Sequence, residues 1–406
     1  MKARQGVTVA AMGSPTDPST GSRRLARRLH GVGTTIFAEM SALAARTGAV
    51  NLGQGFPDTD GPESVIEAAV EALREGRNQY APGIGVPELR QAIAEHQQRF
   101  YGLDYDPDAE VLVTTGATEA ISVSMLALVD PGDEVVVLEP YYDSYVAAIA
   151  MAGGRRRPVT LRAPDFRLDI DELRAAVTDR TRLLLVNSPH NPTGAVLTDA
   201  ELSAVAELAV ERDLLVVTDE VYEHLTYDGV MHRPLATYDG MRDRTLTISS
   251  GGKTFSFTGW KVGWICAAPD LVRAVNTAKQ FTTFTSGAPL QPAIATALRL
   301  GDDYYAQLRS SLQAKRDRLC AGLRQAGLQV FVPQGTYFVS TDIRSVGAVD
   351  GVEFCLALPE QCGVVAVPTQ VFYDDVEAGR PLVRWAFCKR DAVLDEAVAR
   401  LCSGLG

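Results

Sequence analysis

The stretch that decides how this chain is interpreted is TLTISSGGKTFSFTGWKVGW, residues 245–264. It begins with a β-type run at 245–248, and a second apolar run follows at 262–265. We therefore expect two strands with a loop between them. The loop is too rich in glycine and serine to bury an ordinary core, and Lys253 lies in its middle. Taken alone, Lys253 is best interpreted as a solvated residue, because lysine is mostly exposed.

Two neighbours of Lys253 favour a different interpretation. Ser250 precedes Lys253 and offers a hydroxyl donor, while Lys261 follows it and offers a second cation. A nucleophilic amine, a hydroxyl and a positive charge are the groups needed to hold a phosphorylated aldehyde as a Schiff base. The remaining sequence must then supply the other parts of such a site.

Composition and charge exclude several classes of protein. The chain has 406 residues, 46% of them hydrophobic, and no apolar run approaches the roughly 18 residues of a membrane span. A net charge of −11 argues against a nucleic-acid partner. The six cysteines are scattered without a C-x-x-C pair and the five histidines lack metal-ligand spacing. We expect a cytoplasmic enzyme of 406 residues with reduced thiols and no metal.

The N-terminal part carries one anion-binding candidate. Residues 1–24, rich in Gly, Ser, Thr and Pro, are expected to form a disordered tail. Helical spacing begins at Ile36 and breaks at Gly48. Gly53 and Gly55 then bracket a place where backbone N–H groups could meet an anion, although taken alone these glycines favour an ordinary turn. The G-x-G at 83–85 follows no strand, so a dinucleotide fingerprint is rejected.

From residue 110 to 230 the chain alternates between strand and helix patterns. Strands are expected at 110–115, 134–138, 182–186 and 214–218, and helices at 117–129, 142–151, 171–177 and 199–212. This alternation predicts an α/β fold with a largely parallel sheet and helices on both faces. Ligands of such sheets bind beyond the carboxyl ends of the strands.

Residues with useful chemistry fall at those strand ends. Ala117 and Thr118 lie in a strand-to-helix turn that suits a phosphate, with a plain turn as the alternative. Asp219 ends an apolar strand, where a carboxylate is costly unless it is paired. A pyridinium N–H is a suitable partner, and an ordinary N-cap aspartate is the alternative.

The C-terminal third contributes a candidate carboxylate-binding residue. Helical patterns at 271–281 and 291–325 lead into shorter strands and helices from 330 onward. Arg384 interrupts the apolar run 381–387. Its guanidinium suits a bidentate grip on an α-carboxylate, although a structural ion pair is equally consistent with the pattern.

Taken together, the motifs resemble those of a known family. Five segments match motifs of class I/II aminotransferases and come in the same order along the chain. They are N-L-G-Q-G-F-P-D at 51–58, H-N-P-T-G at 190–194, S-x-G-K-T-F at 250–255, T-G-W-K-V-G-W at 258–264 and R-x-x-F-x-K at 384–389. The class I/II aminotransferases are pyridoxal-phosphate enzymes of fold type I. The resemblance covers about residues 34–400, and the chain is similar to kynurenine, glutamine, methionine or N-succinyldiaminopimelate aminotransferases.

The resemblance implies an activity and a set of site residues. Lys253 would hold pyridoxal 5'-phosphate as an aldimine, and an amino group would pass from an L-amino acid to a 2-oxo acid through the pyridoxamine form. Lys253 would be the catalytic base and acid. The implied cofactor residues are Ala117, Thr118, Tyr142, Asn191, Asp219, Tyr222, Ser250, Lys253, Lys261 and, from a partner chain, Tyr80. The implied substrate residues are Phe37, Gly53, Asn191 and Arg384, with Phe284 and Thr285 projecting into the neighbouring subunit's pocket.

The resemblance also implies how the chain is divided. A large cofactor domain would span 63–299, and a smaller α/β domain would combine 25–62 with 300–406, in a homodimer with shared active sites. A β-eliminating carbon–sulfur lyase on the same fold is the nearest alternative. A P-loop enzyme is rejected because Thr247 occupies the required earlier glycine position. A regulator with an aminotransferase-like domain is disfavoured, because the 24-residue tail leaves no room for a DNA-binding module.

Overall fold

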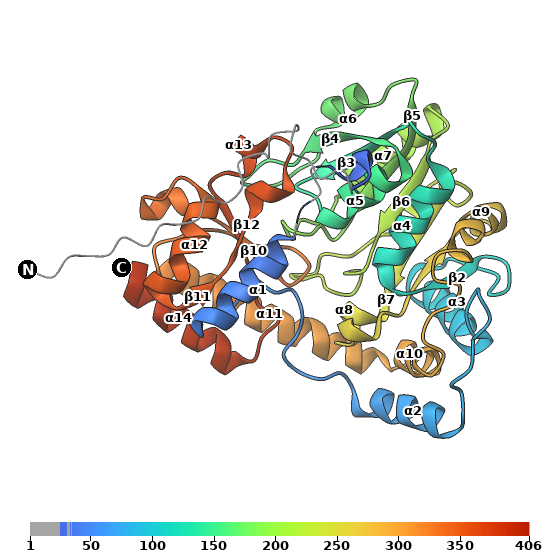
Figure 1. The fold of residues 1–406 in the computed structure, drawn as a ribbon, viewed down its shortest axis with the longest axis horizontal. Coiled ribbons are helices and arrows are strands. Elements are labelled where there is room, and N and C mark those ends of the chain that lie inside the picture. Colours follow the sequence, from blue (N-terminus) through green and yellow to red (C-terminus); the bar gives the residue numbers. More distant parts are fainter. Residues whose placement is uncertain (1–24, 31–32, 34, 406) are drawn as a thin grey trace, which may run out of the picture.

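A seven-stranded sheet forms the centre of the larger part of the molecule (Figure 1). The computed structural model describes residues 25–30, 33 and 35–405. The strand order is β2-β8-β7-β6-β5-β3-β4, and only β8 runs antiparallel to its two neighbours. The strands are β2 (Val111–Thr114), β3 (Glu134–Glu139), β4 (Arg155–Thr160), β5 (Thr181–Asn187), β6 (Leu215–Asp219), β7 (Thr245–Ser250) and β8 (Gly263–Cys266).

The predicted α/β fold and its mostly parallel sheet are confirmed, and one strand was missed. All four strands predicted between residues 110 and 230 are present, as are the two that flank Lys253. The missed strand is β4, whose sequence RRRPVT begins with three arginines and contains a proline. Its first residues are exposed at the edge of the sheet, so the apolar pattern that reveals a buried strand is absent there.

Helices cover both faces of this sheet (Figure 1). One face carries α4 (Gly116–Leu128), α5 (Asp143–Ala152) and α9 (Pro269–Lys279), whose apolar side chains share one core with the strands. The opposite face carries two further groups of helices, which pack against the other side chains of the strands. These are α6 (Ile170–Ala176) and α7 (Asp199–Glu211), and then α2 (Glu63–Arg74), α3 (Pro87–Tyr101) and α10 (Leu290–Leu298).

The C-terminal part forms a second, smaller sheet of order β12-β13-β10-β9, in which all pairs are antiparallel. Its strands are β9 (Gln329–Phe331), β10 (Phe338–Asp342), β12 (Val367–Pro368) and β13 (Leu382–Ala386). A separate core joins it to α1 (Ile36–Thr47), α11 (Asp302–Gln325), α12 (Gly351–Cys362) and α14 (Asp391–Leu405). The N-terminal segment belongs to this core, because β1 (Val50–Asn51) pairs with β11 (Val364–Val365).

Two helical predictions need correction. The pattern at 291–325 is not one helix, because α10 ends at Leu298 and α11 begins after Gly301, which adopts an extended conformation. Lys253 does not lie in an irregular loop but in the one-turn helix α8 (Gly251–Thr254), where two glycines hid the helical character. The domain boundaries proposed from the sequence remain predictions, and residues 1–24 lie outside the described part of the chain.

The remaining short elements are connectors. They are η1 (Arg27–Leu29), η2 (Leu235–Thr237), η3 (Thr258–Trp260), η4 (Ile343–Val346), η5 (Thr369–Phe372) and α13 (Val376–Gly379). Within residues 25–30, 33 and 35–405, every helix is too short or too polar to span a lipid bilayer.

Candidate active site

A cavity of 390 Å³ opens at the carboxyl ends of β2, β5, β6 and β7, where α1, β10 and β13 of the smaller part face the large sheet. Parallel strands deliver their last residues to one edge, so distant sequence motifs meet there. Of the fifteen residues predicted for the site, eleven line this cavity: Phe37, Ala117, Thr118, Tyr142, Asn191, Asp219, Tyr222, Ser250, Lys253, Lys261 and Arg384. The other four predicted residues do not line the cavity; they are Gly53, Tyr80, Phe284 and Thr285.

Lys253 projects from α8 into this cavity and is half-buried. Its Nζ lies 5.8 Å from the ring centre of Tyr222 and 5.7 Å from that of Tyr337. Burial lowers the pKa of Lys253 to about 8, and the cations Lys261 and Arg384 act in the same direction. The neutral amine, which is the form that acts as a nucleophile or base, is therefore a minority near physiological pH but far more abundant than for an exposed lysine.

The first turn of α4 forms an anion seat beside this amine. Gly116 has φ +73°, and Thr115, at the N-cap, makes no side-chain cap bond, so backbone N–H groups of the first turn remain available. The Nζ of Lys261 donates to Thr118 Oγ1 at 3.4 Å. Ser250 adds a hydroxyl at the end of β7. A helix N-terminus, a cation and two hydroxyls suit a phosphate group.

Asp219 is the last residue of β6 and is buried. Its Oδ2 accepts a hydrogen bond from the Tyr145 hydroxyl at 2.6 Å, and its Oδ1 accepts a longer one from the Val221 N–H at 3.4 Å. The Asn187 amide donates to the carbonyl of Asp219 at 2.7 Å. Burial raises the pKa of Asp219, and the hydrogen bonds and Lys253 oppose that rise. Tyr145 and Asn187 also line the cavity and were missed from the sequence.

Arg384, on β13, lies buried at the far side of the cavity. Its Nη1 donates to Asn191 Oδ1 at 3.0 Å and its Nη2 to the carbonyl of Gly53 at 2.9 Å. The N–H of Gly53 donates to Asn51 Oδ1 at 2.9 Å, so the backbone donor expected at Gly53 already has a partner. Burial lowers the pKa of Arg384 to about 10, which leaves it protonated at neutral pH.

Aromatic rings close the cavity around the guanidinium. The Arg384 Cζ lies 3.9 Å from the ring centre of Phe338 and 4.9 Å from that of Phe37. Phe37 in turn stacks on Phe372 with ring centres 5.6 Å apart. Phe338 was not predicted, because a phenylalanine at the start of a short strand looks like core. These contacts hold the charged group in an apolar frame and strengthen its attraction for an anion.

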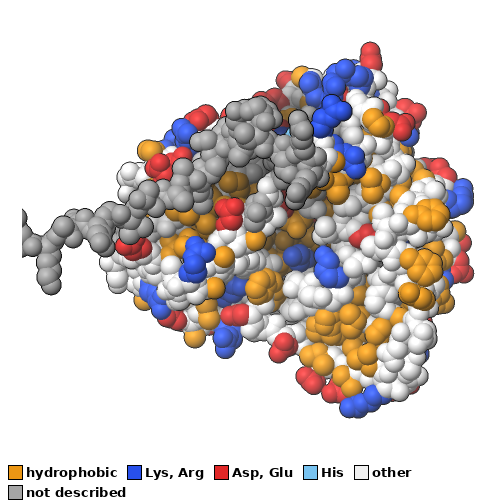
Figure 2. Space-filling view, in the orientation of Figure 1, with side chains coloured by type: hydrophobic (Ala, Val, Ile, Leu, Met, Phe, Trp, Pro, Cys, Tyr) orange, Lys and Arg blue, Asp and Glu red, His pale blue; other side chains and the backbone are white. Residues whose placement is uncertain are grey.

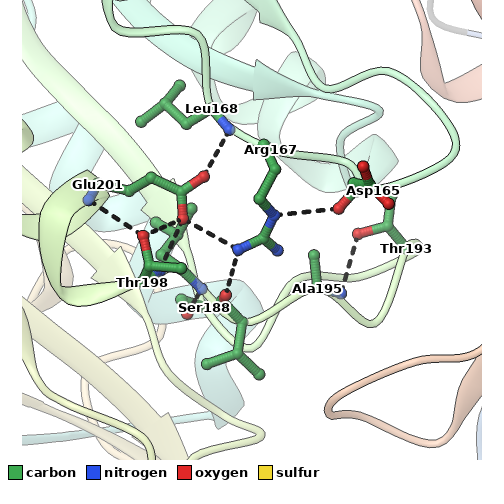
Figure 3. A network of polar contacts seen from close by, with 10 residues as sticks. Asp165, Arg167, Leu168, Ser188, Thr193, Ala195, Thr198 and Glu201 are labelled. Atoms are coloured by element: carbon green, nitrogen blue, oxygen red, sulfur yellow. Dashed lines mark hydrogen bonds and ion pairs between the residues drawn. The ribbon is translucent and has the colours of Figure 1, made fainter.

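Polar contacts hold the segment that follows β5, and Figure 3 shows those around Ser188, Thr193 and Ala195. Glu201 accepts hydrogen bonds from the Leu168 N–H at 2.7 Å and from Arg167 Nη1 at 3.1 Å. The same Arg167 nitrogen donates to the carbonyl of Val196 at 3.1 Å. His190 is buried against Thr193 Oγ1 at 2.8 Å, and burial lowers its pKa to about 3. His190 thus packs as a neutral ring.

Three predicted residues lie apart from the cavity. Tyr80 is 83% exposed, and its ring packs edge-on against Phe284, whose centre lies 5.5 Å away. Thr285 follows Phe284 in the same connection between α9 and α10. Lys279, buried, holds this connection by donating to the carbonyls of Gly83 and Phe284 at 2.8 and 2.9 Å. The connection therefore has a defined shape although it faces outward.

One cluster elsewhere has the composition of a metal site. The ligand atoms of His96, Glu223 and His224 lie within 4.8 Å of one another and are buried. The two Nε2 atoms are 2.7 Å apart, a hydrogen-bond distance, whereas two nitrogens on one tetrahedral zinc would be roughly 3.3 Å apart. Glu223 already accepts from Tyr101 at 2.7 Å and Ser249 at 2.5 Å. We interpret the cluster as a hydrogen-bonded network, and the expected absence of a metal remains a prediction.

Comparison with known proteins places these features in context. Residues 47–401 match the family Aminotransferase class I and II. The chain is 54% identical to the probable N-succinyldiaminopimelate aminotransferase of Mycobacterium tuberculosis, over 92% of this chain and 97% of the relative. It is 41% identical to the methionine aminotransferase of Escherichia coli, again over 92% and 97%.

The fold agrees with a solved structure of the same group. The structure of N-succinyldiaminopimelate aminotransferase from Mycobacterium tuberculosis superposes with a TM-score of 0.92 and 55% sequence identity. The match covers 94% of this chain and 100% of that chain. Sequence and fold are thus shared over more than nine tenths of the chain.

Proposed function

The chain belongs to the class I and II aminotransferases, and from that premise we propose that the cavity around Lys253 is its active site. The protein is a pyridoxal-phosphate-dependent aminotransferase, which moves an amino group from an amino acid to a 2-oxo acid. No observation favours a carbon–sulfur lyase. One observation carries the site assignment: a single cavity of 390 Å³ is lined by the Lys253 amine, the buried Asp219 carboxylate, the first turn of α4 and the Arg384 guanidinium.

The residues of the cavity fit pyridoxal phosphate. The phosphate would lie on the first turn of α4 with Ser250 and Lys261, and a side chain at Gly116 would intrude there, since its Cβ would come within 3.1 Å of Lys261 Nζ. The ring nitrogen would face Asp219, and Tyr142 would cover the ring. When bound, the cofactor supplies an aldehyde that condenses with amines and a protonated ring that withdraws electrons from the substrate Cα.

Arg384 and Asn191 are proposed to orient the substrate. Arg384 has five N–H groups, of which two are used for Asn191 and Gly53. The remaining N–H groups include the buried Nε, which has no partner among the described residues. They can grip both oxygens of an α-carboxylate. With Oδ1 of Asn191 occupied by Arg384, its Nδ2 is left to donate into the cavity.

Lys253 is proposed to attach the cofactor and, once displaced by a substrate amine, to move the proton at Cα. Burial keeps its pKa about 8, so Nζ accepts a proton from Cα and returns one without a large mismatch. The surrounding rings of Tyr222 and Tyr337 limit the access of water to Nζ.

The residues that line the cavity indicate which kind of amino acid donates the amino group. The cations among its described lining residues are Lys253, Lys261 and Arg384, and each has a proposed task. The lining residues that have no proposed cofactor contact include the aromatic Phe37 and Phe338 and the polar Thr35, Gln54 and Asp143. We therefore propose a donor with an uncharged side chain, such as methionine or glutamine. Competition between methionine and N-succinyl-L,L-diaminopimelate tests this, and preference for the succinylated donor would contradict it.

We also propose a homodimer in the cytoplasm. Tyr80 and Phe281 are 83% and 85% exposed, and such large exposed aromatics mark interaction surfaces. Figure 2 shows hydrophobic side chains gathered at the lower right of the molecule, where Figure 1 places α2, α3 and α10. None of the six cysteines is paired, which supports a reducing compartment. Analytical ultracentrifugation should give twice the chain mass, and a monomer with full activity would refute the shared site.

The assignment of Lys253 is tested by substitution. Lys253→Ala should abolish turnover and yet retain part of the cofactor affinity, because the phosphate seat and Asp219 are untouched. Lys253→Arg, which keeps the charge but not a titratable amine, should be equally inactive. Transamination by either variant would show that another group performs the proton transfer.

A further inference from the structure

Helix α5 places two tyrosines on the cavity, one turn apart. Tyr142 is the N-cap residue, and Tyr145 lies three positions later, with ring centres 5.8 Å apart in an edge-to-face arrangement. The Tyr145 hydroxyl donates to Asp219 Oδ2 at 2.6 Å. Tyr145 is 2% exposed and belongs to the apolar core on that face of the sheet, so its hydroxyl has a fixed position.

The direction of this hydrogen bond follows from the environment. Burial and the neighbouring Asp219 carboxylate raise the pKa of Tyr145 well above its usual value, so the phenol keeps its proton and donates. The bond in turn lowers the pKa of Asp219, against the rise that burial causes. The other contact of the carboxylate, from the Val221 N–H, is weak at 3.4 Å. Tyr145 is thus the strong partner of Asp219 among the described residues.

We propose that Tyr145 is a positioning residue for the cofactor ring. Its hydroxyl fixes the Asp219 carboxylate and keeps that carboxylate a weaker base than the ring nitrogen that would face it. This inference rests on the proposed role of Asp219. One proton is shared between Asp219 Oδ and the ring nitrogen. A donor on the carboxylate stabilises its ionised form and so keeps that proton on the nitrogen, where it makes the ring electron-withdrawing. Tyr142 is the N-cap of the same helix, so α5 would supply both the residue that covers the ring and the residue that fixes its carboxylate partner.

The test is the protonation of the ring nitrogen in Tyr145→Phe, measured as the ¹⁵N chemical shift of ¹⁵N-labelled pyridoxal phosphate bound to the protein. Loss of a hydrogen bond to a charged group changes an equilibrium by roughly tenfold or more. The ratio of protonated to neutral ring should fall by about that factor, and the resonance should move toward the neutral position. In steady state, kcat should fall about tenfold with KM nearly unchanged, since no substrate contact is lost.

Tyr141→Phe is the matched control. Tyr141 is another buried tyrosine, and its hydroxyl donates to a different carboxylate, Asp374 Oδ1, at 2.8 Å, away from the cavity lining. Tyr141→Phe should lower thermal stability about as much as Tyr145→Phe does, because each loses one buried hydrogen bond, and it should leave the ¹⁵N shift unchanged. An equal shift in both variants would mean that any lost tyrosine hydroxyl disturbs the ring, which would overturn the inference.

Asp219→Asn separates this inference from the site assignment. If Asp219→Asn moves the ¹⁵N resonance and Tyr145→Phe does not, Asp219 pairs with the ring and Tyr145 plays no part, which overturns the inference alone. If Asp219→Asn has no effect either, the proposed ring position fails as well. Should Tyr145→Phe not fold, 3-fluorotyrosine at position 145 keeps the ring and strengthens the donor. It must then move the resonance toward the protonated position, and a shift toward the neutral position would refute the proposal.

Discussion

Replacing Arg384 by lysine separates charge from geometry in substrate binding. The guanidinium uses one N–H of Nη1 for Asn191 and one of Nη2 for the carbonyl of Gly53, and three N–H groups remain. A lysine ammonium has only three, so meeting the same two partners leaves one for the substrate. The variant keeps the positive charge but holds the α-carboxylate by one hydrogen bond instead of two.

The expected cost follows from that difference. A hydrogen bond between charged groups contributes roughly 1.5–3 kcal/mol, so kcat/KM of Arg384→Lys should fall by about ten- to a hundredfold. Most of the change should appear in KM, because the carboxylate is gripped before the chemical step as well as during it. The assay is initial-rate kinetics with methionine and a fixed 2-oxo acid, which gives kcat and KM separately.

Two controls make the result specific. 3-(Methylthio)propylamine lacks the carboxylate of methionine, so its slow half-reaction should be the same in Arg384→Lys and in the unaltered protein. Arg316→Lys alters another buried arginine, paired with Asp228 at 2.5 Å and away from the cavity, and should lower stability without changing KM. An unchanged KM in Arg384→Lys, or an equal loss with the amine, would refute the carboxylate grip.

Three further outcomes are expected. The pre-steady-state half-reaction should rise with pH and level off above about 8, because burial lowers the pKa of Lys253 to about 8 and only the neutral amine accepts the proton; a rate that falls across this range would contradict it. Lys261→Ala should weaken cofactor binding about tenfold or more in equilibrium dialysis, since one phosphate cation is lost. Gly116→Ala should cost about 1 kcal/mol or more in thermal unfolding, because φ is +73° and the new Cβ would come within 3.1 Å of Lys261 Nζ; an unchanged melting temperature would show that the turn relaxes freely.

The sequence predicts the central sheet and much of the cavity for one physical reason. Thr118 and Asn191 follow apolar strands and Asp219 ends one, and parallel strands end at a common edge. The same argument fails for β4, whose exposed arginines break the apolar pattern at the sheet margin. It also fails for α8, because glycine is a poor helix former and tertiary contacts decide that turn.

The supporting residues of the site could not be predicted from the sequence. Tyr145 and Phe338 look like core residues, and only the folded chain shows that Tyr145 donates to Asp219 and that Phe338 lies against Arg384. The contact between Gly53 and Arg384 joins residues 331 positions apart. Such contacts depend on side-chain direction across two sheets, which periodicity does not encode.

The most direct test of the site is the visible spectrum of the purified protein before and after addition of one amino acid without an acceptor. The account predicts a yellow absorbance band from cofactor attached at Lys253, and loss of that band when a suitable donor such as methionine is added. A protein that shows no band, even after incubation with pyridoxal 5'-phosphate, would contradict the assignment of the Lys253 cavity as the cofactor site.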